Sequence, residues 1–134
     1  FEAPNLDTDI YYLKRKIDIG ADYVTTQMFF NNEHYYNYEK RCKEHNVNVP
    51  ILPGLKPLTN KRQLNMIPSI FNVEVPYDLY NVMMKTKNEA DSDKVGTEWL
   101  LAQCRDLLKN NVPVLHFYTL GKPQIVYNVL KELF

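Results

Sequence analysis

The chain has 134 residues, of which 45% are hydrophobic and 24% charged, and this composition is typical of one folded domain rather than a disordered chain. Sixteen basic residues balance sixteen acidic ones, so the net charge gives no argument for a nucleic acid or a membrane surface as a partner. No apolar run approaches the roughly 20 residues of a transmembrane helix, and no signal-peptide pattern opens the chain.

The two cysteines, Cys42 and Cys104, have neither the spacing of a metal site nor a disulfide framework around them. Each falls in a helical pattern, which favours a buried and reduced thiol. These features predict a cytoplasmic protein without a bound metal. The first residue is Phe1 rather than methionine, which indicates a piece of a longer protein.

The first third of the chain predicts a helix, a strand and a second helix. Capping residues over 5–8 begin the first helix, apolar residues recur at helical spacing, and Gly20 ends it. Residues 23–30 follow as a strand. Asn31 and Asn32 then turn the chain into the second helix.

A short apolar run bounded by prolines, residues 49–55, predicts a second, fully buried parallel strand. We expect Pro53 and Gly54 where this strand leaves the sheet, because proline is tolerated there. Asn60 and Gln63 have the spacing of a capping box and predict that a short helix follows the strand.

The second half of the chain predicts further helices and one more strand. Pro68 is expected to end or kink the short helix, and another helix follows it. Asp91 or Ser92 caps a long amphipathic helix. Residues 113–119 predict the third strand, and Pro123 opens the last helix.

This order predicts an α/β fold with about three parallel strands and flanking helices. Three parallel strands are few, because such sheets normally have both faces covered. A closed eight-stranded barrel solves this problem by packing its inner face on itself. We therefore interpret residues 1–134 as one unit, the C-terminal portion of a (β/α)8 TIM barrel.

Two glutamines lie where such a barrel binds its ligands. Gln27 is near the end of the first strand, and its amide offers both a donor and an acceptor. Its position alone leaves open whether it binds a ligand or is satisfied by a neighbouring group. Gln63 lies in a loop between a strand and a helix, and it is either a ligand contact or simply part of the capping box.

Other candidate residues have simple structural interpretations. Asp9, Arg15 and Lys16 lie on the first helix, where a solvated face is expected, although Arg15 and Lys16 also suit a pyrophosphate. His116, in the third strand, is expected to be a core histidine bonded to a backbone group. The four glycines form neither a dinucleotide fingerprint nor a P-loop.

Three blocks of sequence, LKRKIDIGADYVTTQMFF, ILPGLKPLTN and LHFYTL, together resemble the methylenetetrahydrofolate reductase family. They occur in the family's order and span nearly the whole chain. The resemblance implies a barrel that binds FAD at the carboxyl ends of its strands. It also implies that NADH or NADPH reduces the flavin, and that methylenetetrahydrofolate is then reduced to methyltetrahydrofolate in the same pocket, a step of one-carbon metabolism and methionine biosynthesis.

The resemblance also assigns roles to residues by their motif positions. Gln27 resembles a glutamine that hydrogen-bonds the pterin ring, and Gln63 resembles a second glutamine near the substrate and the nicotinamide. Lys122 stands at the position of an arginine that the resemblance places near the folate. The FAD-binding positions on the first helix are Asp9, Tyr12, Arg15 and Lys16.

The chain departs from the family pattern at three single positions and in its opening segment. Tyr12 replaces a frequent asparagine, and Ile67 replaces a phenylalanine that covers the ligand in some members. Lys122 keeps the charge of the arginine but lacks its bidentate fork. The opening FEAP, residues 1–4, replaces the family's HPEA, and the flavin-contacting histidine before that point is absent.

The resemblance places the proton-donating glutamate on the first barrel strand and a flavin-binding Arg-Gly-Asp loop after the fourth, both upstream of this chain. We therefore expect no catalytic acid within residues 1–134, and we predict that this piece alone lacks reductase activity and binds FAD weakly. The full enzyme is expected to be a homo-oligomer. The alternative is a non-catalytic, stand-alone α/β domain for binding or interaction.

Overall fold

The computed structural model describes residues 5–134, so the FEAP motif lies outside the described residues. Three parallel strands and six helices alternate along this part of the chain, which confirms the predicted α/β class. The elements are α1 (Leu6–Asp18), β1 (Val24–Met28), α2 (Asn32–Glu44), β2 (Ile51–Leu55), α3 (Gln63–Phe71), α4 (Tyr77–Met84), α5 (Glu89–Lys109), β3 (His116–Phe117) and α6 (Pro123–Leu133).

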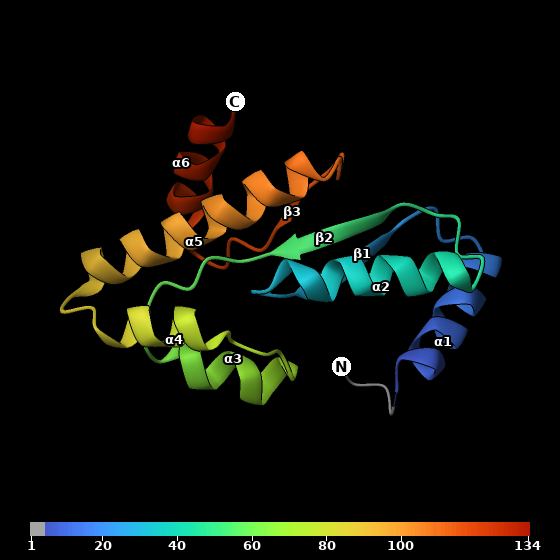
Figure 1. Cartoon of the computed structure of the whole chain (residues 1–134), viewed down its shortest axis with the longest axis horizontal. Helices are drawn as coiled ribbons and strands as arrows, with labels where there is room; N and C mark the ends of the chain where they lie inside the picture. The colour runs from blue at the N-terminus through green and yellow to red at the C-terminus, as the bar shows by residue number, and fades with distance from the viewer. Residues whose placement is uncertain (1–4) are drawn as a thin grey trace.

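The strand order is β1-β2-β3, and both neighbouring pairs are parallel. The three strands therefore end at the same edge of the sheet, which we call the carboxyl edge. In Figure 1, α3 and α4 lie beyond the carboxyl end of β2, and α1 is well separated from both. This arrangement is that of part of a (β/α)8 barrel, in which loops at the carboxyl ends of the strands form the site.

Helices α2, α5 and α6 cover one face of the sheet, which we call the covered face. Their apolar side chains meet those of the strands in one core cluster, with the aromatic ring of Phe29 stacked on Tyr35. The buried members of this cluster are Phe29, Tyr35, Leu55, Leu100, Cys104, Leu107, Val112, Val126 and Val129.

The other side of the sheet, which we call the open face, carries Thr25, Gly54 and His116, whose neighbours in the ladder alternate with residues of the covered core. Gln27 and His116 are exposed, and the edge of the His116 ring meets the ring of Tyr118 at a centroid distance of 4.8 Å. The prediction of a core histidine at position 116 was wrong. Position 116 alternates with Leu115 and Phe117, whose side chains pack toward the covered core instead.

A bulge in β1 accommodates the proline of β2. The register runs from Thr25 opposite Leu52 directly to Met28 opposite Gly54, so two residues of β1 face Pro53. A proline cannot donate to the ladder and is tolerated at such a bulge. Pro53 and Gly54 therefore lie inside the central strand, and the prediction that they mark its exit from the sheet was wrong.

Helix α5 is capped by Asn88, not by Asp91 or Ser92 as predicted. The side-chain oxygen of Asn88 accepts a hydrogen bond of 2.9 Å from the Asp91 N–H. In return, the Asp91 carboxylate accepts one of 3.0 Å from the Lys87 N–H. These reciprocal bonds satisfy backbone donors that the helix itself leaves free.

Two other elements differ in length from their predictions. The third strand pairs only at His116 and Phe117, because β2 offers it only Gly54 and Leu55 as partners. Helix α3 continues through Pro68 to Phe71, so the proline does not end it.

Both cysteines are free and buried, as predicted. Burial raises the pKa of the Cys104 thiol to about 12, which keeps it protonated and unreactive. No helix in residues 5–134 has the length and the apolar character needed to cross a membrane.

Candidate functional site

The carboxyl edge gathers the three predicted substrate-binding residues. Gln27 is the penultimate residue of β1, Gln63 opens α3 after β2, and Lys122 lies between β3 and α6. Because β1, β2 and β3 are adjacent and parallel, their following residues share one edge of the sheet. That these residues bind a ligand stays a prediction. The fold places all three of them at the same edge of the sheet.

Gln27 is exposed at the end of β1 and is only partly satisfied by the protein. Its side-chain oxygen accepts a hydrogen bond of 3.0 Å from the Met28 N–H. Its amide nitrogen has no partner among the described residues, so both of its N–H donors are available to a ligand.

Gln63 makes cap-type hydrogen bonds, which is one of the two roles that its sequence position left open, and its role as a ligand contact stays a prediction. Its backbone N–H donates to the side-chain oxygen of Asn60 at 3.2 Å, as in a capping box. Its side-chain oxygen accepts from the Thr59 N–H at 2.7 Å, one residue earlier than a standard capping box. The side-chain N–H groups of Gln63 have no partner within residues 5–134, and they remain open to a ligand.

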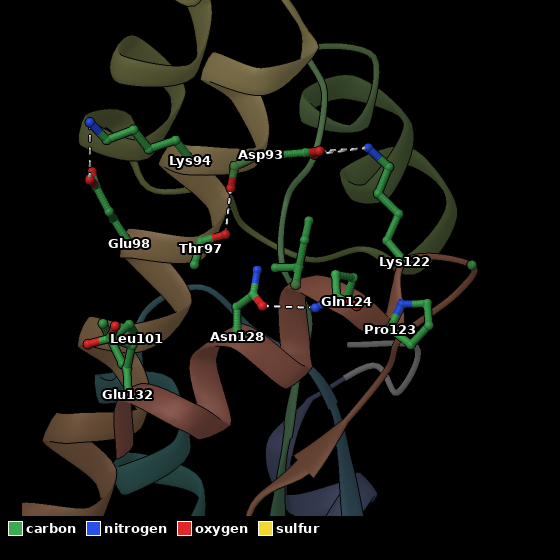
Figure 2. A pocket seen from close by; sticks show the side chains of 12 residues that line it. Asp93, Lys94, Thr97, Glu98, Leu101, Lys122, Pro123, Gln124, Asn128 and Glu132 are labelled. Carbon is green, nitrogen blue, oxygen red and sulfur yellow. Dashed lines mark hydrogen bonds and ion pairs between the residues drawn. The ribbon is translucent and has the colours of Figure 1, made fainter. Parts of the chain in front are cut away.

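Lys122 is held by two carboxylates of α5, and Figure 2 shows the one that belongs to Asp93. Its ammonium lies 2.6 Å from an oxygen of Glu89 and 2.9 Å and 3.2 Å from the two oxygens of Asp93. These carboxylates raise the pKa of Lys122 and neutralise much of its charge. A folate contact through Lys122 would therefore have to compete with two ion pairs.

A groove of about 660 Å³ lies between α5 and α6 (Figure 2). Asp93, Glu98 and Glu132 contribute acidic groups to it, whereas Lys94 and Lys122 contribute basic ones. Neither Gln27 nor Gln63 lines this groove. It belongs to the surface between two helices and is a separate feature from the open face.

The predicted cofactor-binding residues of helix α1 differ in their exposure. Asp9 is half-buried and close enough to Tyr38 of α2 to help raise the pKa of that phenol, which burial raises most. Tyr12, Arg15 and Lys16 are exposed. No ion pair engages Arg15 or Lys16 within residues 5–134, so this surface fits a pyrophosphate, which needs free cationic donors.

No hydrogen bond or ion pair among the described residues connects these α1 side chains to Gln27, Gln63 or Lys122. Ile67 stands at the position where the resemblance implies a phenylalanine that covers the ligand in some members. Its side chain is fully buried in the core between α3 and α4 and is therefore remote from solvent.

Gly54 allows a tyrosine to lie across the open face. A side-chain carbon at Gly54 would lie 2.8 Å from the Tyr118 ring and would overlap the Thr26 carbonyl oxygen. The Tyr118 hydroxyl donates to that same carbonyl at 3.0 Å. The pair fixes β3 to β1 across β2 and gives the open face an aromatic surface near Gln27.

Helix α5 holds the backbone that directly follows β1 through two hydrogen bonds. The Trp99 indole N–H donates to the Phe30 carbonyl at 3.0 Å, and the Gln103 amide donates to the Phe29 carbonyl at 3.2 Å. These bonds hold the backbone that follows Gln27, and a rigid support of this kind is what a binding group needs.

Lys56 is a feature that the sequence analysis did not single out. It directly follows β2 at the carboxyl edge and, among the charged side chains of residues 5–134, it alone is buried, with 5% of its surface exposed. Burial lowers its pKa, and no carboxylate offsets the effect. A visible signal was present, because the lysine interrupts the apolar run ILPGLKPL.

The carboxyl edge and the open face together offer amide donors, an aromatic ring and a buried amine, which are groups suited to binding a polar ring system. Within residues 5–134, no group of three or more His, Cys, Asp or Glu is placed to hold a metal ion.

The family model and the curated relatives that match this chain agree on one family. A family model described as methylenetetrahydrofolate reductase matches residues 1–134. A Caenorhabditis elegans protein described as a probable methylenetetrahydrofolate reductase (NADPH) is 33% identical, over 98% of this chain and 20% of its own length. The 5,10-methylenetetrahydrofolate reductase of Escherichia coli K12 is 31% identical, over 98% of this chain and 45% of its own length.

The corresponding enzyme of Buchnera aphidicola from Schizaphis graminum is 33% identical, over 96% of this chain and 44% of its own length. The chain therefore spans less than half the length of these curated relatives. Among solved structures, an uncharacterised Clostridium thermocellum protein that binds two copies of 5-methyl-5,6,7,8-tetrahydrofolic acid has a TM-score of 0.61. It is 18% identical, covers 93% of this chain and 47% of its own, and shows a shared fold.

Proposed function

The chain belongs to the methylenetetrahydrofolate reductase family, and on this premise we propose that it forms the C-terminal portion of an FAD-dependent reductase. The enzyme reduces 5,10-methylenetetrahydrofolate to 5-methyltetrahydrofolate with NADH or NADPH, in one-carbon metabolism and methionine biosynthesis. The observation that carries the proposal is the family match over the whole chain, and the free amide donors of Gln27 at the carboxyl edge support it.

In this proposal, Gln27 and Gln63 orient the folate through their side-chain N–H groups. Arg15 and Lys16 on α1 hold the pyrophosphate of FAD, with Asp9 and Tyr12 on the same helix. Lys122 meets the folate after exchanging a carboxylate partner. The flavin supplies the hydride chemistry when bound, whereas the residues of this chain bind and orient its substrates. The proton donor lies outside this chain.

The proposal includes a homo-oligomeric enzyme of the cytoplasm. The free, buried thiols of Cys42 and Cys104 suit a reducing compartment. Light scattering of the purified complete protein measures its oligomeric state, and a monomer at all concentrations would contradict that part of the proposal.

Gln27→Glu in the complete protein tests the role of the carboxyl edge. Replacing the amide by a carboxylate removes both N–H donors, so reduction of the folate should fall by about tenfold or more while reduction of the flavin by NADH or NADPH changes less. Stopped-flow absorbance measures the two half-reactions separately. The matched control is Gln124→Glu on the exposed surface of α6, which should leave both rates unchanged. Equal losses in the two half-reactions would contradict the role of Gln27.

A second measurement concerns residues 1–134 alone. We expect this piece to lack reductase activity and to bind FAD weakly, because the proton donor and part of the flavin site belong to other segments. Flavin-dependent NADH oxidation by the isolated piece, at rates typical of whole enzymes, would overturn this expectation.

A further inference from the structure

Lys56 is a buried charged side chain that has no counter-ion within residues 5–134. It leaves β2 directly after Leu55, and only 5% of its surface is exposed. No hydrogen bond or ion pair engages its ammonium within residues 5–134. Removing an ammonium from water without a partner is costly, so proteins rarely tolerate such a group without a use for it.

The strand geometry places Lys56 near the open face. Side chains alternate along a strand, and Leu55 points into the covered core, so Lys56 follows Gly54 on the other side. Gly54 is opposite His116 in β3, and the Tyr118 N–H donates to the Leu55 carbonyl at 2.8 Å. The titratable groups beside Lys56 on β3 are therefore His116 and Tyr118, and neither is a carboxylate.

Two lysines at the carboxyl edge differ in whether a carboxylate compensates their charge. Lys122 is held by Glu89 and Asp93, so its charge is compensated within the protein. Lys56 has no such compensation, although it lies deeper. Lys56 directly follows β2, at the edge where the three strands end and where ligands of this fold bind.

We propose that Lys56 is an anion-binding residue, whose ammonium contacts a phosphate or carboxylate group of the ligand that binds at the carboxyl edge. The inference rests on the proposed function for the identity of that ligand. FAD, NADH and NADPH carry phosphates, whereas the folate carries the carboxylates of its glutamate. A charge-assisted bond in a poorly hydrated place is stronger than the same bond in water, which offsets the cost of burying the amine.

Ligand affinity tests the proposal in the complete protein. Isothermal titration calorimetry with inorganic pyrophosphate, FAD, NADPH and 5-methyltetrahydrofolate should show a loss of about tenfold or more for Lys56→Met with the ligand that supplies the anion. Lys56→Arg keeps the charge and should lose less. Losses confined to the phosphate-bearing ligands identify the phosphate as the anion, whereas a loss confined to the folate identifies the carboxylate.

Lys61→Met is the matched control, because Lys61 lies in the same loop but is exposed. It removes the same charge from the same edge and should leave every affinity within about twofold. An equal loss for Lys61→Met and Lys56→Met would show a general electrostatic effect and overturn the proposal.

The titration of Lys56 itself separates a binding role from a structural one. In the protein with isotope-labelled lysine, NMR should show a low pKa for Lys56 without ligand and a clear rise when the anion binds. A pKa that no ligand moves, together with unchanged affinities in Lys56→Met, would overturn the proposal. A normal pKa of Lys56 without ligand, together with a destabilised Lys56→Met protein, would also overturn the proposal. In that case the counter-ion of Lys56 would come from the protein itself.

The outcomes also distinguish a failure of the anion site from a failure of the proposed reductase function. If pyrophosphate raises the pKa of Lys56 while neither FAD nor the folate binds, the anion site stands and the reductase proposal fails. If FAD and the folate bind normally and Lys56→Met changes nothing, the reductase proposal stands and the anion site fails.

Discussion

The two faces of the sheet differ in what their side chains contribute. The covered face is apolar and closely packed, and α2, α5 and α6 exclude water from it. The open face and the carboxyl edge carry Gln27, His116 and Lys56, which are exposed, partly satisfied or uncompensated. The covered face thus forms an apolar core, whereas the carboxyl edge holds the candidate binding groups, so substitutions at these two places should have separable effects.

The largest effect is expected where α5 crosses the segment that leaves β2. A side-chain carbon at Gly96 would overlap the carbonyl of Leu58, which is backbone and cannot move aside. Gly96→Ala should therefore lower the free energy of unfolding by about 3 kcal/mol or more. In an open helix position the same change would instead stabilise by about 1 kcal/mol. Urea denaturation followed by circular dichroism measures the difference.

Gly20→Ala is a suitable control for this prediction. No atom of residues 5–134 lies within 4 Å of a side-chain carbon at Gly20, but its φ of +115° strains an alanine. It should cost only about 1 kcal/mol, which is the cost of the backbone conformation alone. Equal losses at the two glycines would show that the contact with Leu58 is not what makes Gly96 necessary.

The next largest effect on the free energy of unfolding is an increase rather than a loss. Lys56→Met removes a buried amine and keeps its volume, so it should raise the free energy of unfolding of the ligand-free protein by about 1 to 2 kcal/mol at neutral pH. Burial lowers the pKa of Lys56 below the ordinary value of 10.5, so the native state holds fewer protons than the unfolded state between these two pKa values.

The wild-type protein should therefore gain stability as the pH rises through that window, and the advantage of Lys56→Met should shrink toward pH 10.5. Urea denaturation at several pH values measures both variants. Destabilisation by Lys56→Met at every pH would mean that the amine is satisfied in the folded protein, and the separation between the two faces would then be weaker than the structure indicates.

A smaller effect is expected from the polar bonds that join α2 to α5 at the rim of the covered face. The Asp106 carboxylate accepts hydrogen bonds of 2.7 Å from both Asn32 and Tyr36. These bonds lower the pKa of Asp106. Because the site is exposed, Asp106→Asn should cost about 1 kcal/mol or less.

The sign of the pH dependence follows from the lowered pKa of Asp106. Its contribution is fully present above the unfolded value of 3.8 and is lost as the pH falls through the lower folded value. Wild type and Asp106→Asn should therefore differ at neutral pH and converge in acid. A difference that persists below the folded pKa would assign the effect to packing rather than to the charge.

The order of helices and strands was predictable because local spacing determines it. Asn31 and Pro123 begin their helices as the sequence indicated, and the parallel topology follows from the alternation of elements. Asn88 was missed because Asp91 and Ser92 are equally good capping residues, although Asn88 and Asp91 have the spacing of a reciprocal cap.

The positions of the candidate binding residues in the fold were predictable, but their hydrogen-bond and ion-pair partners were not. The strand end located Gln27, whereas the ion pairs of Lys122 with Glu89 and Asp93 join residues 33 and 29 positions apart and leave no local signal. The burial of Lys56 likewise depends on how β3 and the segments after β2 pack together. Local patterns therefore find the strand ends, and only the packing shows which polar groups remain free.

The smallest effect on stability is expected at Gln27, where the comparison of the two faces is sharpest. Its side chain is exposed, and its one hydrogen bond is to the adjacent Met28 N–H, so Gln27→Ala should change the free energy of unfolding by less than about 0.5 kcal/mol. Leu55→Ala, on the covered face of the neighbouring strand, should cost about 2 to 5 kcal/mol. Urea denaturation of both variants makes the comparison. A loss at Gln27 approaching that at Leu55 would mean that the carboxyl edge also carries folding free energy, and the division of roles between this edge and the covered face would not hold.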